Sequence, residues 1–327
     1  MLDPENIYVD PQMAPIIEQM LAQMSGREPF GTAAPEMMRQ RFNNDIAAWN
    51  ENPPDLPRVV DGTIEGPAGP LNYRLYDPVG DGEPLPCMLH FHGGGWVVGD
   101  YETNDRTLRL LAKLSGVAVL SADYRLAPEN KFPAGMNDCV AVSRYVHEQA
   151  AELGVDPTRI GISGDSAGGN LALATALELR DRGENWLRFM LLVYPALSPE
   201  GNSRSRRILG NGEYGLGTDA MEFFWSQYLN EVSERKNPLV APLLANMSGL
   251  PSTLIVSGGL DALQDDAFQL EKKLHRANVS NQHYYYPGMV HGFFSMTNFL
   301  DVANEAVADA AAVMASRLAG SSGSECG

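Results

Sequence analysis

Gly164-Asp165-Ser166-Ala167-Gly168 joins an apolar stretch to a helix-forming stretch, and this junction decides the fold class. Residues 159–163 predict a buried strand, and residues 170–179 are rich in strong helix formers. A serine between glycines at such a junction lies on a sharp turn, because small neighbours let the strand and the helix come close together. The turn raises the serine hydroxyl above the sheet, beside the positive end of the helix. We therefore expect Ser166 to be a nucleophile.

A second glycine-rich stretch, His92-Gly93-Gly94-Gly95-Trp96, follows a predicted strand at residues 86–91. Consecutive glycines expose backbone N–H groups, and such groups stabilise the oxyanion that forms during acyl transfer. An ordinary glycine-rich loop is the alternative. The loop directly follows a predicted strand, which is the position where a serine hydrolase supplies its oxyanion donors, together with the amide of the residue after the nucleophile, here Ala167.

A base and an acid are expected on loops that follow later strands. His291 lies on the loop at 287–293, after a predicted strand at 282–286. A base at the end of a strand can reach the nucleophile, so we interpret His291 as the general base. Asp261 follows a buried strand at 253–257, where a carboxylate could orient the imidazole.

Three carboxylates compete for the role of the acid. Asp261 and Gln264 fit a capping box at the start of a helix, and Asp265 and Asp266 could each face the base instead. We favour Asp261 because it lies nearest the end of the strand. The other two aspartates suit the first turn of the helix and its dipole.

Five motifs together resemble the hormone-sensitive-lipase-like family (family IV) of bacterial esterases, of the GDSAG type, in the α/β-hydrolase superfamily. They are H-G-G-G-W at 92–96, D-Y-R-L-A-P-E at 123–129, G-D-S-A-G-G-N at 164–170, L-D-A-L-Q-D-D at 260–266 and G-M-V-H-G-F at 288–293. The resemblance implies a catalytic triad of Ser166, His291 and Asp261. It also implies an oxyanion hole of Gly94, Gly95 and Ala167, and short to medium acyl esters as substrates. The family pattern D-P-L-R-D-E is D-A-L-Q-D-D here, which puts the rigidity of that loop in question.

The fold expected is α/β, an α/β-hydrolase with a mostly parallel eight-stranded sheet, flanking helices and a helical cap. We expect the cap to comprise residues 1–50 and 201–235, the core 51–200 and 236–319, and a disordered tail 320–327. The cap itself is implied by the resemblance. Most of its apolar residues are expected to pack in the core. The expected substrate contacts are Trp96, Phe30, Trp225 and Tyr228.

Composition narrows the partners. The 327 residues carry 24 Lys and Arg against 41 Asp and Glu, a net charge of −17, which argues against nucleic acids and anionic membranes. No apolar run approaches the length of a membrane span, and the first residues lack the features of a secretory signal. Three widely spaced cysteines suggest neither a disulfide framework nor a metal site. We expect a cytoplasmic enzyme without a metal or an organic cofactor, and a homodimer formed through the strand at 282–286.

Two further patterns in the sequence bear on ligand binding. Residues 210–215 match the G-x-G-x-x-G pattern of dinucleotide sites, but a polar loop precedes them where a strand is required. Arg204, Arg206 and Arg207 are expected to form a solvated cluster.

Three chemistries remain alternatives to ester hydrolysis: cleavage of lactones, amides or carbamates by the same residues. A non-catalytic receptor for a small ligand is a less favoured alternative, because all three triad candidates are present.

Overall fold

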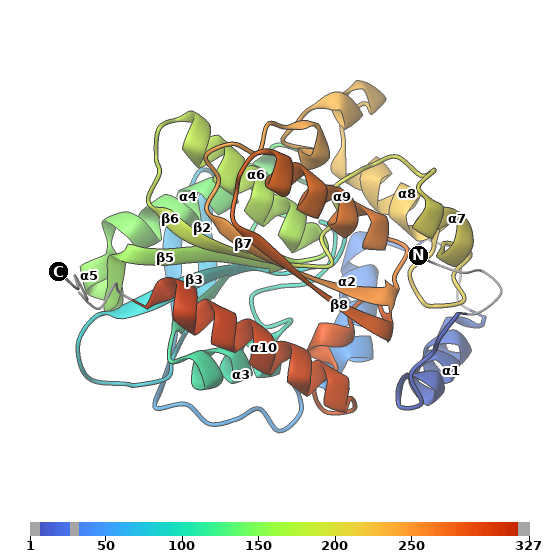
Figure 1. The fold of residues 1–327 in the computed structure, drawn as a ribbon, viewed down its shortest axis with the longest axis horizontal. Helices are drawn as coiled ribbons and strands as arrows, with labels where there is room; N and C mark the ends of the chain where they lie inside the picture. Colours follow the sequence, from blue (N-terminus) through green and yellow to red (C-terminus); the bar gives the residue numbers. More distant parts are fainter. Residues whose placement is uncertain (1–6, 27–32, 320–327) are drawn as a thin grey trace.

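The computed structural model describes residues 7–26 and 33–319, which form one sheet covered on both faces by helices (Figure 1). The sheet has eight strands in the order β1-β2-β4-β3-β5-β6-β7-β8. Strands β3 to β8 run parallel, whereas β2 pairs antiparallel with both β1 and β4. The strands are β1 (Arg58–Gly66), β2 (Gly69–Asp77), β3 (Leu85–Phe91), β4 (Ala118–Ala122), β5 (Val155–Asp165), β6 (Leu187–Val193), β7 (Ser252–Leu260) and β8 (Asn281–Val290).

The described helices form two layers and an additional group at one end. Helices α3 and α10 cover one face of the sheet, and α4, α6 and α9 cover the other (Figure 1). The α-helices are α1 (Met13–Met24), α2 (Pro35–Ile46), α3 (Asp105–Ser115), α4 (Ala134–Glu148), α5 (Ala150–Leu153), α6 (Ala167–Asp181), α7 (Arg204–Leu209), α8 (Thr218–Tyr228), α9 (Gln264–Arg276) and α10 (Asp301–Leu318). Single 3-10 turns are η1 (Ala47–Asn50), η2 (Val232–Lys236), η3 (Pro242–Leu244) and η4 (Phe293–Ser295).

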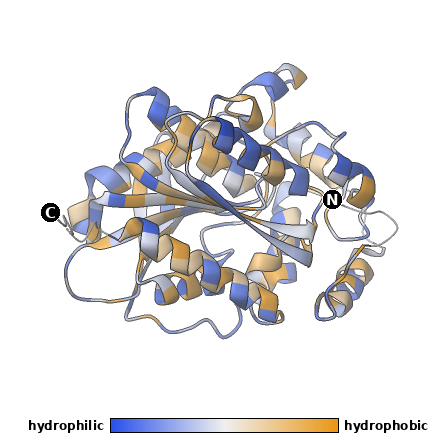
Figure 2. Cartoon of the chain, viewed as in Figure 1, coloured by the Kyte–Doolittle hydropathy of each residue, from blue (hydrophilic) through white to orange (hydrophobic). Residues whose placement is uncertain are grey.

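The core lies on the two faces of the parallel strands. Strands β4 and β6 are apolar and almost wholly buried, as expected for a parallel sheet with helices on both sides. The covering helices carry hydrophobic and hydrophilic residues on different sides (Figure 2). Helix α6 is an exception, because it is buried along nearly its whole length. Its position beneath α4 and against β5 fixes the start of the helix, and therefore Ala167, relative to the sheet.

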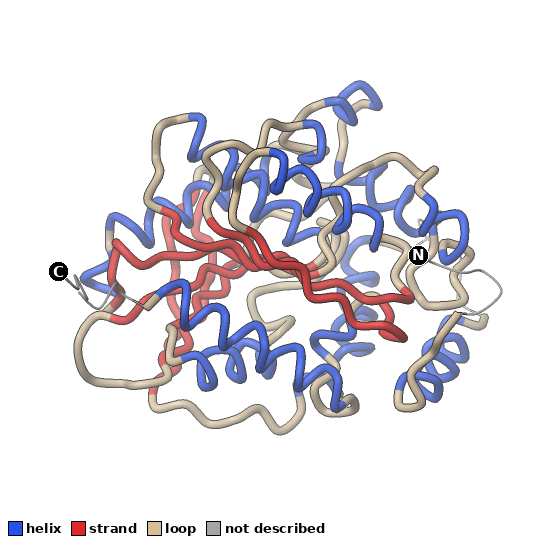
Figure 3. Tube along the Cα trace, viewed as in Figure 1, coloured by secondary structure: helices blue, strands red, loops and turns tan. Residues whose placement is uncertain are grey.

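The parallel strands all end at one edge of the sheet, and the loops that carry the predicted site residues begin there. Helices α1, α2, α7 and α8 gather at the same end of the molecule (Figure 1), beside the ends of the strands drawn in red in Figure 3. Segments from the first 50 residues and from the middle of the chain therefore lie next to the same loops. This is the arrangement expected of a cap, although the division into cap and core domains stays a prediction.

Several predicted elements differ from the observed ones in length. β8 extends to Val290, four residues beyond the predicted end, because β7 and β8 continue to pair across an irregularity between Gly258 and Leu260. The strand pair β1 and β2 had no counterpart in the sequence analysis. The predicted substrate contact Phe30 and the predicted disordered tail at 320–327 lie outside the described residues.

Candidate active site

Ser166 lies on the turn between β5 and α6 in a strained backbone conformation. Its φ and ψ angles are 53° and −118°, values that non-glycine residues rarely adopt. The two glycines around it are required by close packing. A Cβ at Gly164 would lie 2.3 Å from the Gly168 backbone, and a Cβ at Gly168 would lie 1.9 Å from the Phe91 carbonyl oxygen. The turn thus has the sharp geometry of a nucleophile elbow.

The structure brings Ser166, His291 and Asp261 together in one line of hydrogen bonds. His291 Nε2 lies 2.8 Å from Ser166 Oγ, and His291 Nδ1 lies 2.8 Å from Asp261 Oδ2. Each residue comes from a loop at the same sheet edge, after β5, β7 or β8. Asp261 is completely buried, whereas the His291 side chain retains 15% exposure on the side of the cavity. The order and spacing match those of a serine hydrolase triad.

The two competing carboxylates point elsewhere. Asp265 Oδ2 accepts the backbone N–H of Ser205 at 2.9 Å, and Asp266 Oδ2 accepts the N–H groups of Leu197 and Ser198. The capping box considered for Asp261 is not formed, because α9 begins only at Gln264, with Leu263 as its N-cap and no side-chain cap. Among the three aspartates, Asp261 alone faces His291.

The glycine loop adopts left-handed backbone conformations beside Ser166. The φ angles of Gly94, Gly95 and Trp96 are 114°, 59° and 62°. A Cβ at Gly94 would lie 2.1 Å from the Val98 carbonyl oxygen, so only glycine fits there. The loop is also held from below, since the Tyr124 hydroxyl donates to the His92 carbonyl at 2.8 Å. Gly94 and Gly95 of this supported loop line the cavity.

A cavity of about 190 Å³ opens above Ser166. Its floor consists of the glycine loop, Ser166, Ala167 and His291. Its walls are mainly apolar and come from four separate regions. These wall residues are Phe42 and Ile46 of α2, Trp49 of η1, Trp96 and Val98 after the glycine loop, Tyr194 and Ala196 after β6, and Leu216, Met221 and Phe224 on and before α8.

Of the predicted substrate contacts that the structure describes, Trp96 lines this cavity, while Trp225 and Tyr228 do not. The prediction for Trp225 and Tyr228 is wrong for a packing reason. Both side chains are buried in the core. The Tyr228 ring stacks on the Trp96 ring with 4.5 Å between the ring centres, and the centre of the Trp225 ring lies 4.2 Å from that of Trp96. The preceding residue of α8, Phe224, faces the cavity in their place.

The expected solvated arginine cluster is also wrong for Arg206. Its side chain and that of Asp266 are both 1% exposed, with Arg206 Nη2 3.3 Å from Asp266 Oδ2. Arg206 also donates to the carbonyls of Ser198 and Glu200. Burial raises the pKa of Asp266 to about 6, although the charge of Arg206 opposes this shift. The pair ties α7 to the start of α9.

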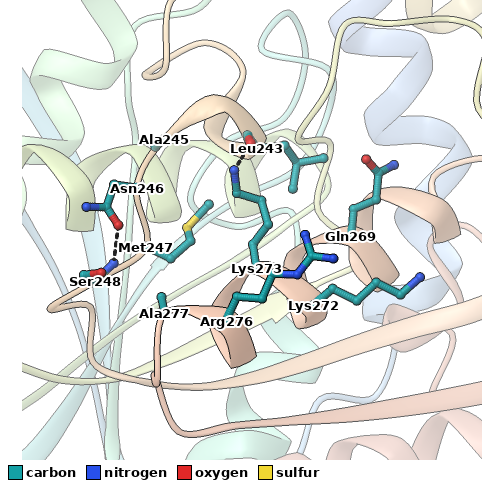
Figure 4. Close-up of a pocket in the computed structure, with 10 residues that line it drawn as sticks. All are labelled: Leu243, Ala245, Asn246, Met247, Ser248, Gln269, Lys272, Lys273, Arg276 and Ala277. Atoms are coloured by element: carbon teal, nitrogen blue, oxygen red, sulfur yellow. Dashed lines mark hydrogen bonds between the residues drawn. The ribbon is translucent and has the colours of Figure 1, made fainter.

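A larger cavity of about 520 Å³ lies elsewhere, between residues 243–248 and α9 (Figure 4). Its wall includes the basic side chains of Lys272, Lys273 and Arg276, and Lys273 Nζ donates to the Leu243 carbonyl at 2.6 Å. None of the predicted catalytic residues lines it. The smaller cavity is therefore the candidate active site.

Neither a metal site nor a membrane span is found in the described part of the chain. Residues 7–26 and 33–319 contain no group of three or more His, Cys, Asp or Glu side chains suited to a metal ion. No helix within these ranges is long and apolar enough to cross a membrane.

Comparison with known proteins places the chain in a family. The sequence matches the alpha/beta hydrolase fold family over residues 88–295, nearly two thirds of the chain. The chain belongs to the α/β-hydrolase family. Within it, this hydrolase falls in the hormone-sensitive-lipase-like group, family IV, which confirms the resemblance and the fold class predicted from its motifs.

Relatives of this α/β-hydrolase are named as esterases. It is 34% identical to Esterase LipI of Mycobacterium tuberculosis (strain ATCC 25618 / H37Rv), over 89% of this chain and 92% of that protein. It is 29% identical to the acetyl esterase of Salmonella schwarzengrund, over 97% and 99% of the two chains. The hyperthermophilic esterase from the archaeon Pyrobaculum calidifontis superposes with a TM-score of 0.90 at 37% identity, covering 95% and 99%. The hydrolase is an enzyme of the carboxylic-ester hydrolase class.

Sequence reasoning missed several polar residues around the site. Asn104, Ser295 and Tyr194 line the cavity, and the contacts of Asp165 beside the nucleophile were not foreseen. The cavity residues Phe42 and Trp49 did appear in the sequence as part of an apolar stripe at helical spacing, but that spacing also fits core packing. Only the contacts between distant segments distinguish the two possibilities.

Proposed function

We propose that this α/β-hydrolase is a serine carboxylesterase that cleaves short to medium acyl esters through an acyl-enzyme intermediate. The observation that carries the proposal is the hydrogen-bonded line from Ser166 through His291 to Asp261 at the floor of a mainly apolar cavity. A nucleophile, a base and an orienting carboxylate in this order are what acyl transfer requires.

In the first half of the reaction Ser166 Oγ attacks the ester carbonyl carbon while His291 Nε2 takes the serine proton. The carbonyl oxygen becomes an oxyanion, and the N–H groups of Gly94, Gly95 and Ala167 bind it. His291 then donates the proton to the leaving alcohol as the C–O bond breaks, which leaves the acyl group on Ser166. Asp261 holds the imidazole in the required tautomer and stabilises its charged form.

In the second half a water molecule attacks the acyl-enzyme and His291 accepts its proton. Collapse of the second tetrahedral intermediate returns the proton to Ser166 and releases the carboxylic acid. The residues named supply every proton transfer in this cycle, so we propose no metal and no organic cofactor.

The size and lining of the cavity support uncharged substrates of limited length. About 190 Å³ is less than the roughly 300–1,000 Å³ of sites for larger ligands. The walls contributed by α2 and α8 are aromatic and aliphatic, which favours short apolar acyl groups over charged ones. The acetyl esterase named among the relatives points to the short end of this range.

Labelling and turnover together test the proposal. A fluorophosphonate probe should modify Ser166 in the native enzyme, and Ser166→Ala should abolish labelling. Ser166→Ala and His291→Ala should each lower kcat on a short aryl ester by about 10⁴-fold or more, with the melting temperature little changed. Ser226→Ala, which changes an exposed serine of α8, is the matched control and should behave like the native enzyme. Labelling at another residue, or substantial turnover by Ser166→Ala, would exclude the serine mechanism.

A panel of substrates separates ester hydrolysis from its alternatives. Esters, lactones, amides and carbamates of matched acyl groups should be compared by kcat/KM, because all four classes could use the same residues. We expect esters to give the highest value. A higher value for any other class would reassign the substrate while leaving the catalytic residues unchanged. Absence of turnover with all four classes would favour a ligand-binding role.

A further inference from the structure

Asn104 lies at the centre of a buried polar network beside the active site. Its side chain is 6% exposed, and it immediately precedes α3. One amide nitrogen, Nδ2, donates to Asp165 Oδ1 at 2.8 Å and lies 3.3 Å from His90 Nε2. The amide oxygen accepts the hydroxyl of Ser295 at 2.9 Å. The residue therefore contacts three different segments of the chain.

The hydrogen-bond donors and acceptors of this network can be assigned. The Ser163 hydroxyl donates to the Leu89 carbonyl at 2.9 Å, so its oxygen accepts from His90 Nδ1, 3.0 Å away. A neutral His90 then offers the lone pair of Nε2 to the Asn104 amide. The two N–H bonds of that amide reach one acceptor each, His90 Nε2 and Asp165 Oδ1. No other uncharged side chain of this size can donate twice and accept once in the same plane.

Asp165 links Asn104 to the glycine loop through hydrogen bonds. The same atom, Asp165 Oδ1, accepts the backbone N–H of Gly93 at 2.9 Å. Asp165 is thus a carboxylate that fixes the residue just before Gly94 and Gly95. It also directly precedes Ser166 in the chain.

Ser295 links Asn104 to the segment that follows the base, His291. It belongs to η4, four residues after His291, and is 5% exposed. Through Ser295 and Asp165, the Asn104 side chain joins the segment after the base to the segment that bears the nucleophile and to the glycine loop. These are the three parts whose relative positions determine whether an oxyanion on Ser166 meets its donors.

We propose that Asn104 is a positioning residue that holds the Gly93–Gly95 backbone in register with Ser166 and His291. This role rests on the proposed esterase function, since it acts through the oxyanion hole. Without the Asn104 amide the oxyanion donors are still present, but their positions shift. A displaced donor weakens the binding of the transition state more than it weakens the binding of the substrate.

The test compares turnover with the binding of a tetrahedral analogue. Asn104→Leu keeps the side-chain size and removes all three hydrogen bonds. We expect kcat on a short aryl ester to fall by about tenfold to a hundredfold, with KM within about twofold. The inhibition constant of an alkyl trifluoromethyl ketone, which forms an oxyanion on the nucleophilic serine, should rise by the same factor as kcat falls.

Two further variants complete the design. Ser295→Ala removes one link only, so both effects should appear in reduced form; this variant also serves if Asn104→Leu does not fold. Asn304→Leu is the matched control, because Asn304 also donates twice, to the carbonyls of Thr297 and Leu300, but has no link to the glycine loop. It should change neither quantity.

The outcomes separate the two proposals. A native enzyme that neither hydrolyses esters nor binds the ketone would contradict the esterase function itself. The positioning role is wrong if the native enzyme hydrolyses esters and binds the ketone, but Asn104→Leu and Ser295→Ala lose turnover without a rise in the inhibition constant of the ketone. It is equally wrong if both variants match the native enzyme.

Discussion

The two carboxylate oxygens of Asp261 have different partners. Oδ1 accepts the Leu263 backbone N–H at 2.7 Å, while Oδ2 lies 2.8 Å from His291 Nδ1. Because the backbone already holds one oxygen, the carboxylate cannot turn from the imidazole without losing a hydrogen bond. The proton of a neutral His291 therefore stays on Nδ1, and the lone pair of Nε2 faces Ser166.

Replacing Asp261 by asparagine tests this assignment. An amide in that place favours the wrong imidazole tautomer, so we expect Asp261→Asn to lower kcat by about 10⁴-fold. Asp265→Asn is the matched control and should stay within about tenfold of the native value, since its carboxylate faces Ser205. Melting temperatures measured alongside kcat show whether each variant is folded. An active Asp261→Asn beside an inactive Asp265→Asn would move the acid to the second residue.

The raised pKa of Asp266 predicts a pH-dependent stability. In the folded protein this pKa is about 6, against 3.8 as its ordinary value. Between these values the folded chain keeps a proton that the unfolded chain has lost, so this group favours folding more as the pH falls from 7 to 5. We expect the native protein to gain about 1 kcal/mol relative to Asp266→Asn over that range. Urea denaturation at both pH values measures it, and parallel pH dependences would refute it.

The sequence was most informative where a residue's role depends on the end of a strand. Ser166, Asp261 and His291 could be predicted because each follows a predicted strand, and parallel strands end at the same edge. Arg206 could not be placed, because its partner Asp266 lies 60 residues away and nothing local marks an arginine as buried. Asn104 was missed for the same reason.

Among the elements, α8 divides its aromatic residues between two environments. Phe224 faces the cavity and lies close to Gly95. A Cβ added at Gly95 would lie 2.3 Å from the Phe224 ring. Trp225 packs against Trp96 in the core. The sequence could not determine which of these two neighbouring residues faces the cavity. The rotation of a helix about its own axis is set by its contacts, here with the glycine loop.

Two alanine variants of α8 should therefore differ in kind. Phe224→Ala widens the cavity, so the ratio of kcat/KM for a hexanoate ester to that for an acetate ester should rise several-fold, on the order of 1 kcal/mol. Trp225→Ala should instead lower the free energy of unfolding by about 3 to 5 kcal/mol. Kinetics on an acyl series and urea denaturation distinguish them. Unchanged chain-length preference in Phe224→Ala would remove this residue from the substrate site.

The errors in the predicted strands have a physical cause as well. β1 and β2 mix buried residues with partly buried and exposed ones and carry several charges, so they lack the continuous apolar signal of the parallel strands. The end of β8 was set too early because Pro287 and Gly288 usually mark a turn. The strand tolerates them where its pairing with β7 is already irregular.

At the scale of the whole molecule, β8 ends the sheet and β7 is its one neighbour in the strand order. The N-terminal segment approaches its far end, where the Asp10 N–H lies 3.5 Å from the Gly288 carbonyl. The earlier part of the strand is the part available for pairing. An edge of this kind invites association with a second copy.

We expect a homodimer formed through β8, and its stability should depend on salt. Two chains of charge −17 repel each other, so the dimer fraction should rise as ionic strength increases from about 0.01 to 0.15 M. Light scattering over a range of concentrations gives the mass, to be compared with 35.6 kDa for one chain. A monomer under all of these conditions would rule the dimer out.

The cavity above Ser166 has walls that come from distant parts of the chain. Residues 42–49, 93–104, 194–224 and 291–295 all contribute, and Asn298 donates to the Ala48 carbonyl across 250 positions. Contacts between such distant segments form slowly, because the intervening loop must first close. A refolding chain can therefore recover its secondary structure before the cavity exists. Catalytic turnover should be the last signal to return after denaturation, and a stricter measure of correct folding than any spectrum.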